Sequence, residues 1–187
     1  DFQKLSRIKG YEKLPKEIQD FFEKEMNSFK IDKKTINFSM DKTKLIYENG
    51  LFQSHDFINV LKFFNKIFFD VEHDINEPKE FKSIYKSLTD LNKMKLKTIK
   101  INIITSHISN IKEFLLQNGT TFSVTVSPSV TSISENAFCE CSLMTQITIP
   151  KSVTTIKSNA FSECSLMEQI NVPSNLTEIG ESCFFQC

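Results

Sequence analysis

The sequence predicts an α/β fold: a solenoid with a parallel sheet of short strands, preceded by a small, mostly helical α+β domain. Residues 130–152 and 153–175 resemble each other at a period of 23 residues, and a third copy begins at residue 176. A fixed period of this size is typical of a solenoid, in which each copy forms one coil and buries its apolar face against the next. The first 95 residues lack the period, and apolar residues at helical spacing dominate them.

Three helices are expected before residue 95. Pro15 suits the first position of a helix, and apolar side chains then recur at three- and four-residue spacing. Ser54 can cap a second helix over residues 55–70, whose apolar residues cover most of its circumference. A helix that is apolar nearly all round is buried, so this segment is expected in the core of the N-terminal domain. Pro78 begins a third, amphipathic helix.

A strand and a hairpin turn are expected between the first two helices. Ile36, Phe38 and Met40 alternate with polar residues, which is the pattern of a half-buried strand. Asn49-Gly50 separates two short apolar runs, and this dipeptide favours a hairpin turn because both of its positions tolerate positive φ. Residues 1–95 are therefore expected to form an α+β domain, and residues 96–187 the repeat array.

One coil can be followed from its strand. Met144, Ile147 and Ile149 lie on one side of a short strand and are expected to point inward. Pro150 ends this strand because proline has no N–H to donate to a ladder. Phe161 is expected to fill the centre of the coil. Stacked coils place such strands side by side at about 4.8 Å, which gives a parallel sheet.

Cys141, Cys164 and Cys187 occupy one position of the repeat, at the corner before the strand. A thiol there is compact, mostly apolar and a weak donor to a backbone carbonyl, so the three are expected to form a structural ladder. All five cysteines lie in the last 49 residues, and an odd count at repeat spacing argues against disulfides. Free thiols favour a cytoplasmic location, with the cell surface as the alternative.

The pattern V-x-x-I-x-x-x-A-F-x-x-C, followed by L-x-x-I-x-I-P, resembles the BspA-like leucine-rich repeats of bacterial surface proteins and protist proteins. The resemblance covers residues 128–187 well, with methionine in place of the first leucine, and residues 96–127 loosely. It implies a leucine-rich-repeat solenoid that serves protein interaction or adhesion. The matching residues are Val130, Ile133, Ala137, Phe138, Cys141, Ile147, Ile149 and Pro150, and again Val153, Ile156, Ala160, Phe161, Cys164, Ile170, Val172 and Pro173.

The period continues upstream in a weaker form. Ile101-Asn102-Ile103 aligns with Val124-Thr125-Val126 at 23 residues, and that triplet aligns with Ile147-Thr148-Ile149. The segment between the first two triplets has the pattern of a helix that stops at Asn118-Gly119. A first coil that contains more helix than the others is what a solenoid needs to cover its end.

The outward side chains of the array strands form the expected binding surface. They are polar and uncharged, which favours many modest hydrogen bonds over charge steering. Leu143 and Leu166 lie at a position that is usually polar in this family, so they would add an apolar anchor. The expected partner-binding residues are Ser123, Thr125, Gln146, Thr148, Gln169 and Asn171.

The sequence contains no convergent set of residues for catalysis. His55, His73 and His107 are scattered, and His73 falls in an acidic stretch that is expected to be a solvated loop. Cys139 and Cys141 form a C-x-C pair with no second pair nearby, so no metal site is expected. We therefore expect a protein that is not an enzyme and has no cofactor.

The expected partner is another protein. A net charge of zero gives no field that would attract nucleic acid, and no apolar run approaches the roughly 20 residues of a membrane helix. Neither nucleic-acid binding nor membrane insertion is therefore expected. The third copy stops before its strand, so further repeats or a partner are expected to cap the C-terminal edge.

An alternative function rests on residues 14–22, which read LPKEIQDFF. This stretch loosely resembles the start of an F-box, the helical module that docks onto ubiquitin-ligase adaptors. The resemblance implies a substrate-receptor adaptor for ubiquitin ligation, with the array as the receptor.

Overall fold

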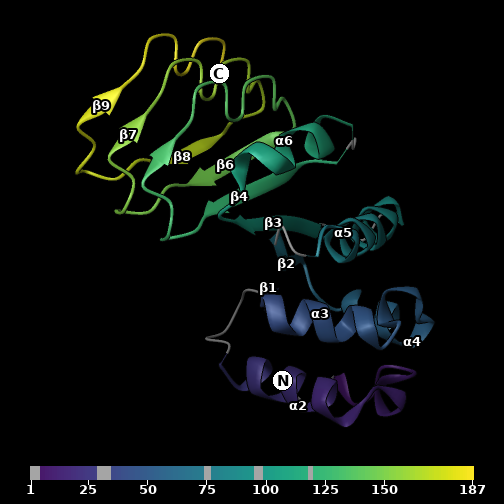
Figure 1. Ribbon diagram of the computed structural model, residues 1–187. Helices are drawn as coiled ribbons and strands as arrows, with labels where there is room; N and C mark the ends of the chain where they lie inside the picture. Colours follow the sequence, from purple (N-terminus) through teal and green to yellow (C-terminus); the bar gives the residue numbers. More distant parts are fainter. Residues whose placement is uncertain (1–4, 29–34, 74–76, 95–98, 118–119) are drawn as a thin grey trace. The chain divides into compact units, whose positions relative to one another are not determined.

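The computed structural model describes residues 5–28, 35–73, 77–94, 99–117 and 120–187 (Figure 1). The chain divides into two compact units. Unit 1 comprises Asp1–Asp70 and Ser83–Lys100, and unit 2 comprises Val71–Lys82 and Ile101–Cys187. The domain boundary expected between residues 95 and 96 stays a prediction.

Unit 1 places helices around a pair of parallel strands. Strands β1 and β2 pair in parallel, with Ile36 opposite Ile67 and Phe38 opposite Phe69. The last three residues of β2 and the first turn of α5 belong to unit 2. The elements are η1 (Tyr11–Lys13), α2 (Lys16–Ser28), β1 (Thr35–Phe38), α3 (Met40–Glu48), η2 (Leu51–Gln53), α4 (His55–Leu61), β2 (Lys66–His73) and α5 (Pro78–Lys93).

Phenylalanine rings fill the core of unit 1. The ring of Phe38 stacks on that of Phe69 with centroids 4.7 Å apart, and Phe22 stacks on Phe64 at 5.8 Å. The ring centroid of Phe57 lies 6.4 Å from that of Phe22, and Phe57 is fully buried. Such offset and edge-on ring pairs add to the free energy gained by burying their area. The helices expected to follow Pro15 and Pro78 and the strand at Ile36 and Phe38 are confirmed. Met40, expected on the same strand, instead begins helix α3.

The hairpin expected at Asn49-Gly50 is wrong. Helix α3 ends at this dipeptide, where the Asn49 N–H donates to the carbonyl of Leu45 and Gly50 adopts a φ of 66°. Of the two residues only Gly50 adopts positive φ, since Asn49 has a φ of −87°, and Gly50 ends a helix, where glycine in the left-handed region is common. The Ser39 side chain accepts from the Lys42 N–H and caps the start of this helix.

The single buried helix expected over residues 55–70 is also wrong. The Ser54 side chain caps α4 as expected, but α4 ends at Leu61 and strand β2 begins at Lys66. Along β2 the buried side chains alternate with more exposed ones, ending at His73. The short apolar run Ile67-Phe68-Phe69 does not by itself distinguish a strand from a helix, so pairing with β1 decides that this segment is a strand.

Unit 2 is a solenoid built on two parallel sheets (Figure 1). The larger sheet includes the strand order β3-β4-β6-β8, and the smaller has the order β5-β7-β9. The expected α/β solenoid with a parallel sheet of short strands is confirmed. The elements are β3 (Ile99–Thr105), α6 (Ile108–Gln117), β4 (Phe122–Val126), β5 (Ser132–Ile133), β6 (Met144–Thr148), β7 (Thr155–Ile156), β8 (Gln169–Asn171) and β9 (Glu178–Ile179).

The register of the sheet follows the repeat in its later coils only. Val124 lies opposite Ile147, and Ile147 lies opposite Ile170, which is the expected spacing of 23 residues. Ile101, however, lies opposite Phe122 and not opposite Val124, so the aligned triplets are offset by two residues. An even offset keeps the apolar face inward, so burial tolerates it. Helix α6 forms the connection here, and the expected stop at Asn118-Gly119 lies outside the described residues.

One ring per coil fills the centre of the solenoid. Phe138 stacks on Phe161 with centroids 5.5 Å apart and planes inclined by 6°, and Phe161 stacks on Phe184 at the same distance and 2°. Phe138 and Phe161 are fully buried. Phe161 therefore packs between the rings of the two neighbouring coils and fills the centre of its coil, as expected.

The turn after β5 is joined to the next coil by a ladder of backbone hydrogen bonds. The N–H groups of Asn136, Phe138 and Glu140 donate to carbonyls of the next coil at 2.8–3.1 Å. The same three bonds recur one coil later, from Asn159, Phe161 and Glu163 at 2.7–3.0 Å. The turn requires positive φ at side-chain-bearing residues, which costs about 1–2 kcal/mol each. These residues recur in each coil: Asn136, Glu140, Asn159, Glu163, Ser182 and Gln186.

The ladder cysteines bond to the turn of the preceding coil. Cys164 Sγ donates to the carbonyl of Phe138 at 3.2 Å, and Cys187 Sγ donates to that of Phe161 at 2.8 Å. Burial raises the pKa of the Cys141 thiol to about 11 and raises that of Cys164 further. These two thiols therefore keep their protons at neutral pH, which suits a donor and makes them poor nucleophiles.

The ring stack can be tested by removing its central member. Phe161→Ala should lower the free energy of unfolding by about 3–5 kcal/mol, because the cavity lies between two stacked rings. Urea unfolding followed by circular dichroism measures this. Phe185→Ala is the matched control, since the Phe185 side chain is 56% exposed and its loss should cost much less. An equal loss of unfolding free energy in the two variants would contradict the central role of the ring stack.

The thiol ladder can be tested by alkylation. Iodoacetamide at pH 8 should modify the exposed Cys187 before the buried Cys141 and Cys164, whose labelling should require unfolding. Burial also raises the pKa of the Cys141 thiol to about 11, so in the folded protein this thiol stays protonated and unreactive at pH 8. Peptide mass spectrometry gives the order. Labelling of Cys164 as fast as Cys187 in the folded protein would refute the buried ladder.

Candidate interaction surface

The outward side chains of the larger sheet form two rows that cross its strands. The first row contains Asn102, Ser123, Gln146 and Gln169, which are paired by the strand register. The second row contains Ile104, Thr125, Thr148 and Asn171. We call these eight residues the strand face. It brings together all six partner-binding residues expected from the sequence with Asn102 and Ile104, and the exposed Lys100 precedes them on β3.

The backbone aims these side chains outward because their neighbours in the strands are buried. Ile103, Val124 and Ile147 are at most 1% exposed and lie on the inner side of the sheet. Successive side chains of a strand point to opposite faces, so the residues between them must point away from the core. The surface is therefore a direct consequence of the apolar pattern that builds the coil.

Hydrogen bonds divide the strand face into ordered ends and an unbonded centre. At one end, Asn102 Oδ1 accepts from Ser123 Oγ at 3.0 Å and from Thr125 Oγ1 at 3.1 Å. At the other, Gln169 Nε2 donates to Asn171 Oδ1 at 3.1 Å. Within the described residues, the side chains of Gln146 and Thr148 on β6 form no hydrogen bond. Their amide and hydroxyl groups are thus available to a ligand.

Exposure of the strand face increases towards β8. Gln146 and Thr148 are half-buried by their neighbours, whereas Gln169 and Asn171 on the edge strand are exposed. None of the strand-face residues carries a charge. The surface can therefore exchange hydrogen bonds without the desolvation cost of an ionised group.

The two leucines expected as an apolar anchor differ in exposure. Leu166 is 47% exposed, whereas Leu143 is half-buried. The backbone carbonyl of Leu143 accepts from the N–H of Phe122 at 3.1 Å, which fixes this corner of its coil. Leu166 therefore presents more apolar area to solvent than Leu143 does.

His73 is not part of a solvated loop, contrary to expectation. It is the last residue of β2 and is 6% exposed. Its Nδ1 lies 3.2 Å from Thr105 Oγ1, which also accepts from the N–H of His107 at 2.9 Å. The ring of Phe81 packs edge-on against it at 4.9 Å. The alternation along β2 could have revealed this position, but the helix expected over residues 55–70 concealed it.

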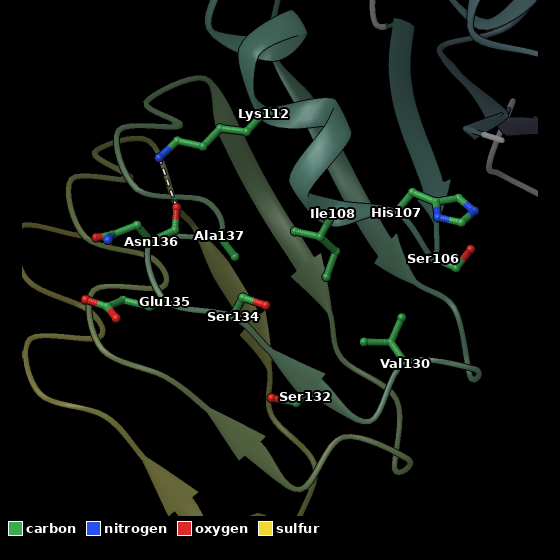
Figure 2. Close-up of a pocket in the computed structure, with 10 residues that line it drawn as sticks. All are labelled: Ser106, His107, Ile108, Lys112, Val130, Ser132, Ser134, Glu135, Asn136 and Ala137. Carbon is green, nitrogen blue, oxygen red and sulfur yellow. Dashed lines mark hydrogen bonds between the residues drawn. The ribbon is translucent and has the colours of Figure 1, made fainter. Parts of the chain in front are cut away.

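A pocket of about 380 Å³ lies between the start of α6 and residues 130–137 (Figure 2). Ile108 projects towards the pocket from α6, and Ser134 faces it from the opposite side. Lys112 crosses one side, where its Nζ donates to the carbonyl of Asn136 at 2.9 Å. The pocket exists because α6 meets the turn of the next coil, so repeat spacing alone could not predict it. No strand-face residue lines it.

Unit 1 has a second hollow, of about 440 Å³, between residues of α2, β1 and α3. Lys42 Nζ lies 2.8 Å from a carboxylate oxygen of Glu17 and 6.0 Å from the ring centroid of Phe21. An ion pair and a nearby aromatic face already satisfy this ammonium group. The hollow therefore offers a partner little unpaired charge.

The described part of the chain contains no group of three or more His, Cys, Asp or Glu residues that could hold a metal ion. No helix in that part has the length and hydropathy to cross a membrane.

A family model described as BspA type leucine rich repeat region, with six copies, matches residues 74–187. This is more than half of the chain, and it includes every strand-face residue. No curated protein matches the chain. Leucine-rich-repeat domains generally mediate protein interaction or adhesion and are typically not enzymes. The repeat, the stacked rings and the family match agree, and the chain belongs to the BspA-type leucine-rich-repeat family.

Proposed function

We propose that the strand face binds another protein and that the chain acts as a non-catalytic interaction or adhesion module. The observation that carries this proposal is the unbonded centre of the face. Gln146 and Thr148 sit side by side on β6, half-buried and without side-chain partners in the described part of the chain. The sheet holds these polar groups in place, and a partner can replace the water around them with its own hydrogen-bonding groups.

Half-buried polar groups favour binding for an energetic reason. Each hydrogen bond to a ligand contributes about 0.5–1.5 kcal/mol net, so several are needed for useful affinity. Adjacent strands lie about 4.8 Å apart, and the sheet holds the rows at that spacing before a partner arrives. Because the backbone is already ordered, little further entropy is lost on binding.

The absence of charge on the strand face predicts the character of the complex. Recognition would depend on shape and hydrogen bonds, and binding would change little with salt concentration. Leu166 lies three residues before Gln169 in the sequence and could add apolar contact area at the rim. The family match does not bear on the alternative of a ubiquitin-ligase adaptor, and no described contact favours that alternative.

Charges placed at the centre of the face test the proposal. Gln146→Glu with Thr148→Lys leaves the net charge unchanged but puts two ionised groups where a partner would bury them. A mispaired buried charge costs about 2–5 kcal/mol, so binding should weaken at least thirtyfold. The partner is first captured from cell lysate with the parent chain, and its affinity for each variant is then measured by surface plasmon resonance.

Thr131→Lys with Thr154→Glu is the matched control. Both side chains are exposed, and neither belongs to the strand face. This variant should bind the captured protein as the parent does, and circular dichroism should show that both variants remain folded. Equal binding by the parent and by the Gln146/Thr148 variant would place the site elsewhere and refute the proposal.

A further inference from the structure

The pocket between α6 and residues 130–137 combines an apolar lining with a cation that has no counter-ion. Its volume is about 380 Å³, and sites for small molecules occupy about 300–1,000 Å³. All of its lining residues belong to unit 2, and none belongs to the strand face. The pocket is therefore a place for a second kind of binding, which the interaction proposed for the strand face does not use.

The apolar part of the lining comes from two elements. Ile108 and Ala137 project into the space from opposite sides (Figure 2). Both side chains are buried, and the half-buried Val130 adds to the lining. Such a surface favours a ligand with an apolar body, because covering apolar area removes it from water.

Lys112 places a positive charge at one side of this lining. Its Nζ donates to the carbonyl of Asn136 at 2.9 Å, which uses one of the three N–H groups of the ammonium. The side chain is half-buried, and it forms no ion pair with any carboxylate of the described residues. An anion stabilises a partly desolvated cation, so the two remaining N–H groups are suited to a carboxylate.

The other polar groups of the pocket leave this charge uncompensated. Glu135 is exposed, and its carboxylate points away from Ile108 (Figure 2). The hydroxyl groups of Ser132 and Ser134 form no hydrogen bond within the described residues, so both can donate to a ligand. Lys112 therefore supplies the charge that a ligand meets beside the apolar lining.

Backbone hydrogen bonds and buried side chains hold the pocket in shape. The Asn136 N–H donates to the carbonyl of Ser158 in the next coil at 3.1 Å, and the Ala137 N–H donates to that of Ser134 at 3.2 Å. Ile111 anchors α6 from its buried side. A ligand would meet an ordered site, so its binding would cost little conformational entropy of the protein.

We propose that this pocket binds a small organic carboxylate with an apolar body, at a site separate from the strand face. The body would lie against Ile108 and Ala137, and the carboxylate would accept from Lys112 Nζ. Inorganic phosphate fits less well, because it is strongly hydrated and would leave the apolar lining uncovered. The same chemistry occurs in a free acid and at the C-terminus of a peptide that ends in leucine.

Isocaproate and isocaproamide test the proposal, because they share one branched apolar body and differ in charge. An NMR titration of the full 187-residue chain should show that isocaproate binds at least tenfold more tightly, since only the carboxylate pairs with the ammonium group. Inorganic phosphate at constant ionic strength should not displace it. Absence of isocaproate binding at millimolar concentration, equal binding of the two compounds or displacement by phosphate would overturn the proposal.

Variants of Lys112 locate the charge. Lys112→Met keeps an apolar stem without the ammonium group, so the affinity for isocaproate should fall at least tenfold, whereas Lys112→Arg should keep the preference for the carboxylate. Lys157→Met is the matched control, because it removes one exposed charge outside the pocket. Equal losses of affinity in Lys112→Met and Lys157→Met would show a response to net charge alone and would refute the site.

A blocking variant tests the pocket without altering its charge. Position 134 corresponds to Lys157 one period of 23 residues later, so the coil accommodates a long side chain there. Ser134→Gln should fill the space and weaken the binding of isocaproate and of isocaproamide alike. Unchanged isocaproate affinity in this variant, with circular dichroism like that of the parent, would contradict binding in the pocket.

Chemical shifts and a peptide identify the contact and the source of the carboxylate. Isocaproate should shift the amide signals of Ile108 and Ala137, and changes confined to Gln146 and Thr148 would assign it to the strand face and refute the separate site. A tripeptide that ends in leucine, with a free or an amidated C-terminus, is then compared with isocaproate. Tighter binding of the free C-terminus would identify a polypeptide end as the ligand and weaker binding a free acid, and either result upholds the carboxylate site.

Discussion

The ladder between successive turns is the constraint on which the solenoid depends. Each coil leaves three N–H groups and one ring face that only the next coil can satisfy, as Asn136, Phe138 and Glu140 show. Buried backbone groups without partners are costly, so no coil of this type is stable alone. The ladder also explains why Asn136 and Asn159 keep positive φ, since the turn then directs three donors to one side.

The same constraint separates the residues that hold the coil together from the residues that can bind a partner. Inward positions such as Val124 and Ile147 are fixed by packing, and the turn is fixed by its ladder. The outward side chains of the sheet, by contrast, can vary at little cost to the fold. This is why the unbonded pair Gln146 and Thr148 indicates binding more strongly than any buried residue of the array does.

Sequence reasoning succeeded where a period repeats and failed where burial removes the period. The strand of Ile147, the stacked ring of Phe161 and the outward position of Gln146 all followed from the repeat. Unit 1 was harder, because the short apolar runs within residues 55–70 fit either a helix or a strand. Their division into α4 and β2 depends on pairing with β1, a contact distant in the sequence.

The sequence by itself determined the repeating coil, its inward and outward residues and its family, because each coil is stabilised by neighbours close along the chain. The tertiary structure alone decided the two-residue offset at Ile101 and the pairing of β2 with β1. These features depend on which segments meet in space. The apolar pattern of one segment does not say which distant segment it will pack against, because the same residues can pack against more than one partner.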